Sequence, residues 1–215
     1  MSVTSLHTST GVPRSTLWTR ASANAIGASG AALFAWVSVE HFVHTRSFVG
    51  VLFVIEQTWI VGAYVARRRA TALSVRGTDW AVAFVGTFAG VLFRPDGAHP
   101  HASVEWGLAL QLVGLTWCLW SLWTLGRSFG FAAADRGLVR RGPYAVVRHP
   151  IYASYVALQL GYVLQSLSLA NVLVMMVATS ANIARIVAEE RVLNHEGQYT
   201  PYRATVPWRL LPGVW

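Results

Sequence analysis

The sequence predicts an all-α, polytopic membrane helix bundle with about six transmembrane helices, the last two forming a hairpin. Charged residues make up 12% of the 215-residue chain, about half of the roughly 25% that is usual in a soluble domain. Hydrophobic residues make up 54%, and the mean hydropathy is +0.44. The one cysteine, Cys118, lies in an apolar run and rules out a disulfide framework within a single chain.

Each transmembrane helix needs about 20 mostly apolar residues. Four such segments are expected at residues 23–43, 48–66, 79–93 and 104–125. The 34 residues 151–184 contain no charged side chain, and as one helix they would be about 51 Å long, against about 30 Å for the hydrocarbon core. We therefore expect this stretch to fold back near residues 165–171, giving helices at about 150–165 and 170–193.

The basic residues predict the topology. All 17 are arginines, and a cytoplasmic N-terminus puts every one except Arg46 and Arg94 on the cytoplasmic side, as the positive-inside rule requires. Without an aqueous domain to carry it, this charge indicates membrane topology rather than nucleic-acid binding. Residues 1–21 are expected to be a disordered cytoplasmic tail and 22–215 a single membrane domain. Residues 198–215 contain three prolines, which predict an irregular segment packed under the cytoplasmic membrane face.

The stretch RGLVRRGPYAVVRHPIY, residues 136–152, combines glycine freedom with positive charge. Gly142 lets the backbone approach a ligand closely, and Pro150 suits the first turn of a helix. Arg148, His149 and Tyr152 then lie at the start of that helix, where an anionic group is favoured. The alternative is a basic juxtamembrane loop that ends in a helix cap.

A second charged cluster, RIVAEERVL, follows the uncharged stretch. Arg185 and Glu189 are four residues apart and share one helix face, next to Glu190. Ionisable groups at the edge of an apolar helix are costly and are commonly functional. A carboxylate there could accept hydrogen bonds from a cofactor, and an arginine could hold a carboxylate or phosphate. The alternative is a surface ion pair.

Together these motifs resemble the isoprenylcysteine carboxyl methyltransferase family and the related phospholipid N-methyltransferases. The resemblance rests on GPY, RHPIY, the uncharged hairpin, R-x-x-x-E-E and YTPYRATVP, in this order. It implies a catalytic part at about 125–215 with a cytoplasmic S-adenosylmethionine site. The pattern has glycine at the position of Ser154, which predicts a change in local packing there.

The resemblance also implies residue roles. Arg185 would face the methyl acceptor, and Glu190 and Arg148 complete the predicted catalytic set, with Glu190 or His149 as the base if a proton must leave. The predicted cofactor-binding residues are Leu138, Val139, Gly142, Tyr144, His149, Pro150, Tyr152 and Glu189. The acceptor would be lipophilic or membrane-bound, such as an isoprenylcysteine carboxylate, and neither a metal nor an obligatory protein partner is expected.

Two other functions remain open at this stage. One is an NADPH-dependent membrane reductase of the steroid 5-alpha-reductase type, and the other is a non-catalytic membrane binding protein. Two further polar features have no assigned role. Glu56 lies inside the second span, where a buried carboxylic acid is expected to be neutral and either bonded across helices or part of a substrate tunnel. Glu40, His41 and His44 are expected to form an interfacial polar cluster rather than a metal site.

Overall fold

A computed structural model gives the fold of the chain and describes residues 17–45, 48–68, 70–94, 101–194, 197 and 199–215. Its seven α-helices are α1 (Leu17–Thr45), α2 (Phe48–Ala66), α3 (Gly77–Phe88), α4 (His101–Leu125), α5 (Pro150–Gln165), α6 (Leu169–Leu193) and α7 (Tyr199–Thr205). Three 3-10 turns are η1 (Ala89–Leu92), η2 (Gly126–Ser128) and η3 (Gly142–Ala145). The all-α bundle predicted from composition is confirmed.

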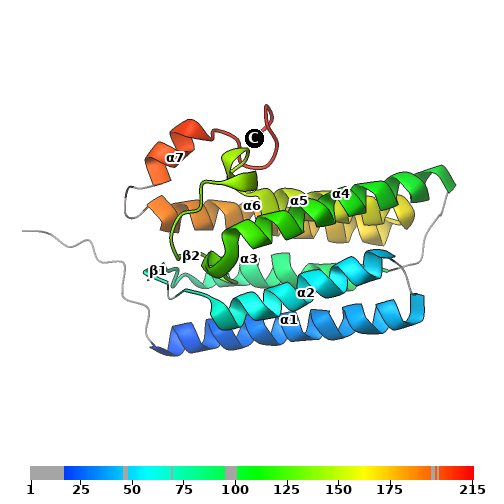
Figure 1. Ribbon diagram of the computed structural model, residues 1–215, viewed down its shortest axis with the longest axis horizontal. Helices are drawn as coiled ribbons and strands as arrows, with labels where there is room; N and C mark the ends of the chain where they lie inside the picture. Colours follow the sequence, from blue (N-terminus) through cyan, green and yellow to red (C-terminus); the bar gives the residue numbers. More distant parts are fainter. Residues whose placement is uncertain (1–16, 46–47, 69, 95–100, 195–196, 198) are drawn as a thin grey trace, which may run out of the picture.

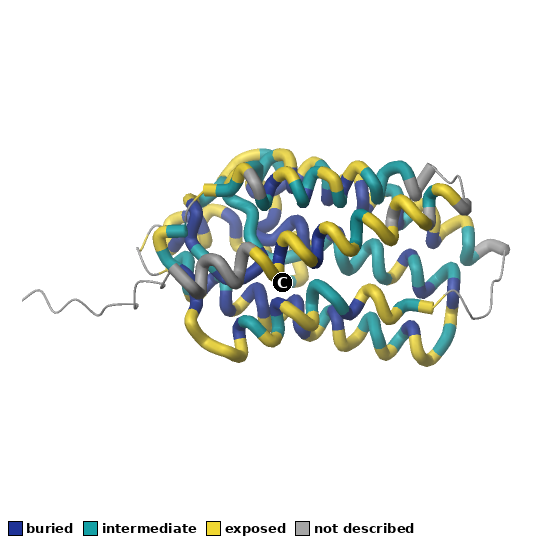
Figure 2. Tube along the Cα trace, turned by 90° about the horizontal axis from the view of Figure 1, so that it is seen from below, coloured by how far each residue is buried: buried dark blue, intermediate teal, exposed yellow. Residues whose placement is uncertain are grey.

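The first six helices lie side by side along the long axis of the molecule (Figure 1). α1 packs against α2, α4 against α5, and α6 against α3. Buried and exposed residues alternate along the helices that can be followed in Figure 2. α5 and α6 are joined by a short turn at the predicted place, but each packs mainly on another helix, α4 and α3 respectively.

The predicted helix ends agree with the structure to within a few residues. α2 has the expected bounds, and the third segment continues from α3 into η1. α1 begins at Leu17, inside the segment expected to be a disordered tail, of which residues 1–16 lie outside the described part of the chain. The C-terminal segment also contains the short helix α7, because Pro201 falls in its first turn, where a missing N–H costs no intrahelical bond.

Two of these helices are long and apolar enough to cross a membrane. They are Ser103–Ser128, which extends α4, and Leu169–Leu193, which is α6. α1, α2 and α3 contain shorter apolar stretches, Ala25–Val37, Val51–Tyr64 and Gly77–Leu92, the last extending into η1. The number of six transmembrane helices stays a prediction.

Glycines allow α4 and α5 to touch backbone to backbone. A Cβ atom added to Gly161 would lie 2.6 Å from the carbonyl oxygen of Gly107, and one added to Gly107 would lie 2.5 Å from that of Gly161. Such small residues are what close helix pairs in membranes require. Ser154, at the position where the family pattern has glycine, is 1% exposed and fits this interface because Gly114 lies opposite its carbonyl.

The turn between α5 and α6 is fixed by Asn171, which is fully buried. Its side-chain amide donates to the carbonyl oxygens of Ser166 at 2.7 Å and Arg94 at 2.9 Å, and it accepts from the Arg94 N–H at 3.0 Å. Ser168 caps α6 by accepting a hydrogen bond from the Asn171 N–H at 3.2 Å. Asn171 therefore explains why the uncharged stretch reverses direction here.

A short antiparallel pair of strands, β1 (Ala72–Leu73) and β2 (Ala134–Asp135), joins two loops at one end of the bundle. Ala72 pairs with Asp135, and Leu73 with Ala134. The sequence did not predict this pair. It matters for the site because it anchors the glycine-containing loop that precedes α5 (Figure 1).

Candidate active site

The loop between β2 and α5 is shaped by two glycines with left-handed backbone conformations. Gly137 has φ 95° and Gly142 has φ 57°, values that other residues rarely adopt. The Gly137 N–H donates to the carboxylate of Asp135 at 2.9 Å. A Cβ atom on Gly142 would lie 3.0 Å from the hydroxyl of Thr124. Gly142 therefore brings the loop close to the end of α4.

The N-terminal turn of α5 and the C-terminal part of α6 meet at Glu189. The hydroxyl of Tyr152 donates to Glu189 Oε1. Arg185 Nε lies 3.4 Å from the same oxygen, and His149 Nδ1 lies 3.9 Å from Oε2. Glu189 remains partly exposed, with 23% of its side chain accessible. The structure thus joins the two charged clusters of the sequence around one accessible carboxylate.

Glu190 has more partners and less exposure than Glu189. It accepts from His149 Nε2 at 3.2 Å, the Tyr199 hydroxyl at 2.9 Å and Arg209 Nη2 at 2.9 Å. Arg148 Nε lies 3.1 Å from its Oε1. Each of these groups stabilises the charged carboxylate, so the arrangement makes Glu190 a poor proton acceptor. Its surroundings indicate a structural junction rather than the general base suggested by the sequence.

Arg185 is 7% exposed, and its guanidinium donates to one hydroxyl and two backbone carbonyl oxygens. Its Nη1 donates to the Thr87 hydroxyl at 3.1 Å, and its Nη2 donates to the carbonyl oxygens of Gly130, at 3.2 Å, and Phe131. The guanidinium carbon also lies 5.5 Å from the ring centre of Tyr152. Arg185 therefore orders the loop that follows η2 as well as facing the interior.

One cavity of about 440 Å³ connects this polar cluster with the apolar interior of the bundle. Its volume is in the range of small-molecule sites. Most of the predicted site residues line it: Leu138, Val139, Tyr144, Arg148, His149, Tyr152, Arg185 and Glu189. The other three predicted residues do not line the cavity but support its wall: Gly142, Pro150 and Glu190. For Pro150 the reason is its place at the first position of α5, where it is buried against the loop.

Arg136, the first residue of the glycine-containing stretch, was not among the site residues expected from the sequence. It lines the cavity, is 8% exposed, and its Nε has no hydrogen-bond partner among the described residues. Burial lowers the pKa of Arg136 to about 10, so it stays positively charged at neutral pH. An unpaired buried cation next to a cavity is costly and fits an anionic ligand group. Its position in the arginine- and glycine-rich motif is the sequence feature that could have identified it as a site residue.

Two tyrosines from the tail, Tyr199 and Tyr202, also line the cavity. Burial raises the pKa of Tyr202 to about 12 and that of Tyr144 well above its usual range, so both phenols are neutral hydrogen-bonding groups. The Tyr202 hydroxyl donates to the Tyr144 carbonyl oxygen at 2.6 Å. The tail therefore closes the polar end of the cavity.

Among the described residues there is no group of three or more His, Cys, Asp and Glu side chains suited to a metal ion. Of the Glu40, His41 and His44 cluster, the side chains of His41 and His44 lie outside the described residues. Glu40 is exposed.

The fold and the site define a helical bundle of membrane type with a small-molecule cavity at the junction of its charged clusters. Residues 102–196 match the family model described as phospholipid methyltransferase. This part of the chain is therefore a domain of a family of integral membrane methyltransferases related to the isoprenylcysteine carboxyl methyltransferases. The resemblance identified from the motifs is confirmed at this level. No curated protein is significantly similar to the chain.

Proposed function

We propose that this protein is an S-adenosylmethionine-dependent methyltransferase whose methyl acceptor is lipophilic and enters from the bilayer. The observation that carries the proposal is the continuity of the cavity. One end is lined by Glu189, His149 and Tyr152, and the other by apolar side chains that include Phe34 and Phe53. Such a cavity can hold a polar cofactor and an apolar acceptor at once, which a membrane methyltransferase requires.

The donor and acceptor groups at the polar end fit the proposed cofactor. Glu189 offers an accessible carboxylate for the hydroxyl and amino groups of a nucleoside. Leu138 and Val139 line the same cavity. Arg136, a buried cation whose Nε has no hydrogen-bond partner among the described residues, suits the carboxylate of the amino-acid part. This set supports the cofactor on chemical grounds.

The cofactor would supply a sulfonium methyl group that is already activated for displacement. The residues of the chain then have mainly to bind, align and exclude water. Tyr152 fixes the orientation of Glu189 through its hydroxyl hydrogen bond, and Arg185 fixes the loop at Gly130 and Phe131. The tail, held at Glu190, covers this end of the cavity. Each of these contacts serves alignment rather than covalent chemistry.

The arginine distribution supports a multi-pass protein with this end of the bundle in the cytoplasm. Arg136, Arg148, Arg185 and Arg209 all gather there, beside the ends of α2 and α6. The acceptor and the surrounding lipids are the proposed partners.

Titration calorimetry of the detergent-purified protein with S-adenosylhomocysteine tests the proposal. We expect micromolar binding that is lost in Glu189→Gln and in Tyr152→Ala. Glu105→Gln is the matched control, because Glu105 is an exposed carboxylate on α4 and its neutralisation should leave binding unchanged.

Absence of binding by a cooperatively unfolding sample would refute the proposal. Titration with the nicotinamide cofactors would then test the reductase alternative. Unchanged binding in Glu189→Gln would instead show that the nucleotide lies elsewhere in the cavity.

A further inference from the structure

Gly130, in the loop that follows η2, lines the cavity and contacts two buried arginines. Its carbonyl oxygen accepts a hydrogen bond from Nη2 of Arg185 at 3.2 Å. The guanidinium of Arg136 occupies the place that a side chain at position 130 would take. A Cβ atom added to Gly130 would lie 2.7 Å from Cζ of Arg136, 3.0 Å from Nη2 and closer still to Nη1. Glycine is therefore the residue that leaves room for this guanidinium.

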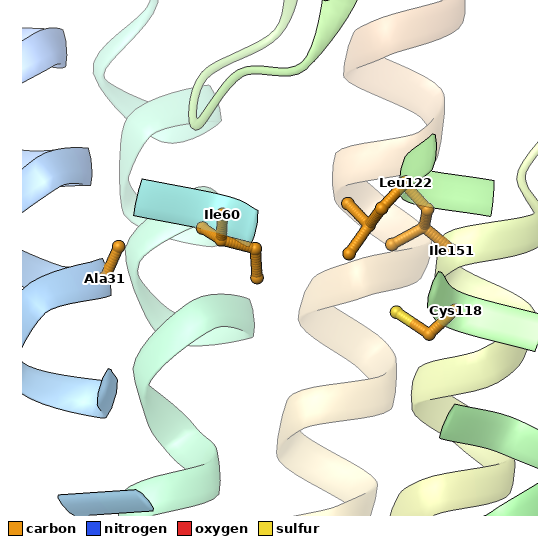
Figure 3. Close-up of a cluster of buried hydrophobic side chains, with 5 residues drawn as sticks. All are labelled: Ala31, Ile60, Cys118, Leu122 and Ile151. Carbon is orange, nitrogen blue, oxygen red and sulfur yellow. The ribbon is translucent and has the colours of Figure 1, made fainter. Parts of the chain in front are cut away.

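The backbone at Gly130 is anchored through both of its neighbours. Phe129 packs against the buried cluster of side chains from α1, α2, α4 and α5 that is drawn in Figure 3. Phe131 is 2% exposed and belongs to a second buried cluster, which includes residues of β1 and α3. The carbonyl oxygen of Phe131 also accepts from Arg185. Because the loop is anchored on both sides, a side chain at position 130 would displace the end of Arg136 rather than the loop.

Other contacts do little to place the guanidinium of Arg136. The hydroxyl of Ser128 donates to the Arg136 carbonyl oxygen at 3.1 Å, which fixes the main chain but not the side chain. Nε of Arg136 has no hydrogen-bond partner among the described residues, and none of their carboxylates forms an ion pair with it. The carboxylate of the preceding residue, Asp135, instead accepts from the Gly137 N–H at 2.9 Å. The place of the guanidinium therefore depends on its contact with Gly130.

Gly130 also links the two groups proposed for the two ends of the cofactor. Arg185, which binds its carbonyl oxygen, has Nε 3.4 Å from Oε1 of Glu189, the carboxylate proposed for the nucleoside. Arg136, proposed for the carboxylate of the amino-acid part, lies against the same glycine. Charge-assisted hydrogen bonds between a guanidinium and a carboxylate depend on their geometry. A guanidinium pushed away from Gly130 should therefore bind this carboxylate less well, without a change at Glu189.

We propose that Gly130 is a positioning residue, which seats the Arg136 guanidinium where it can bind the carboxylate of the amino-acid part of the cofactor. This inference rests on the proposed function and adds to it a residue that acts on one part of the ligand. A ligand with the nucleoside but without the amino-acid carboxylate is indifferent to a side chain at position 130.

Titration calorimetry of detergent-purified Gly130→Ala with two ligands tests the inference. S-adenosylhomocysteine carries the amino-acid carboxylate, and methylthioadenosine has the same nucleoside and thioether without it. We expect the affinity for S-adenosylhomocysteine to fall about tenfold, because a charge-assisted pair is weakened. The affinity for methylthioadenosine should stay equal to that of the wild-type protein. The φ angle of Gly130 lies outside the left-handed region, so alanine fits the backbone and the thermal unfolding midpoint should hold or rise.

Two further variants isolate the contact. Arg136→Met removes the guanidinium, so adding Gly130→Ala to it should cause no further loss of affinity for S-adenosylhomocysteine. Gly62→Ala is the matched control, because nothing lies within 4 Å of its added Cβ atom and Gly62 does not line the cavity. Its affinity for both ligands should equal that of the wild-type protein.

The outcomes separate this inference from the proposed function. If the wild-type protein binds S-adenosylhomocysteine and Gly130→Ala binds it equally well, the role of Gly130 is overturned and the function stands. The same holds if the loss persists in the Arg136→Met background, if both ligands weaken together, or if the wild-type protein does not bind methylthioadenosine. Absence of S-adenosylhomocysteine binding by the wild-type protein would refute the function and, with it, this inference.

Discussion

Arg209 and Glu190 form a forked ion pair that fastens the C-terminal tail to α6. Arg209 Nη2 lies 2.9 Å from Glu190 Oε2, and Nε lies 3.1 Å from both carboxylate oxygens. On the opposite side, Arg148 lies 3.1 Å from Oε1. The backbone N–H groups of Arg148 and His149 also donate to the carbonyl oxygens of Trp208 and Arg209, at 2.9 Å each. One carboxylate therefore holds the tail, α6 and the start of α5 together.

Arg209→Ala should release the tail from the site. Charge-assisted hydrogen bonds of this kind contribute about 1.5–3 kcal/mol, so we expect proteolytic cleavage in residues 206–215 to become roughly tenfold faster. Limited proteolysis with mass spectrometry measures this rate. Arg203→Ala is the control, because Arg203 is an exposed arginine on α7. Equal cleavage rates in both variants would contradict the role of the ion pair.

Arg185→Ala should impair cofactor binding as well as acceptor turnover. From the sequence alone, we would expect turnover to fall while cofactor affinity is largely kept. The hydrogen bonds to Gly130 and Phe131 and the contact with Glu189 change that expectation, because the cofactor wall loses its support. Calorimetry should show affinity for S-adenosylhomocysteine reduced by about tenfold or more.

Arg185→Lys serves as its control. Lysine keeps the charge but cannot reproduce the fork of the guanidinium, so partial loss is expected. If Arg185→Ala kept its full affinity for S-adenosylhomocysteine, Arg185 would act on the methyl acceptor alone.

Arg136→Met should stabilise the ligand-free protein and weaken ligand binding. Burial lowers the pKa of Arg136 to about 10, below its value in the unfolded chain, so the cost of the buried charge is present at every pH below that value. An apolar side chain of similar length removes this cost. We expect a higher thermal unfolding midpoint at pH 7, with about tenfold weaker binding of S-adenosylhomocysteine.

Arg141→Met provides the comparison, because Arg141 is exposed and precedes Gly142, as Arg136 precedes Gly137, in the same loop. Arg141→Met should change neither the thermal unfolding midpoint nor the affinity for S-adenosylhomocysteine. A lower unfolding midpoint in Arg136→Met would mean that the guanidinium stabilises the fold rather than a ligand.

Gly161→Ala should destabilise the bundle by separating α4 from α5. The new Cβ atom would lie 2.6 Å from the backbone carbonyl oxygen of Gly107, which cannot move independently of its helix. Overpacking of this kind costs about 1–3 kcal/mol. Thermal unfolding in micelles should show a lower midpoint. Gly62→Ala is the matched control, because nothing lies within 4 Å of its added Cβ atom, and the midpoint should hold or rise.

The helices were predictable because their signals are local. The bounds of α2 and α5 follow from runs of apolar residues, from the arginines after α2 and from Pro150 at the start of α5. The reversal between α5 and α6 follows from a length limit, since 34 uncharged residues exceed the thickness of a bilayer as one helix. The pair of strands at Ala72 and Ala134 had no such signal, because two-residue strands carry no periodicity.

Most of the residues that line the candidate site were singled out from the sequence, but the contacts that each of them makes were not. The adjacent carboxylates Glu189 and Glu190 look alike in sequence. Successive residues on a helix point about 100° apart, so one faces the cavity with Tyr152 and the other faces the tail with Arg209. Arg136 and Arg148 also look alike in sequence, but Arg148 forms an ion pair with Glu190, and the described residues hold no such pair for Arg136.

The sequence by itself determined the helical class, the positions of the helices, the methyltransferase-family segment at residues 102–196 and the two charged clusters at the candidate site. These properties depend on composition, on apolar run length and on motifs within short stretches of chain. Tertiary structure alone decided that Glu56 of α2 lines the same cavity as Glu189 of α6. It also decided that Glu190 fastens the tail. Both facts depend on which helix faces come together, and that is set by packing between segments far apart in the chain.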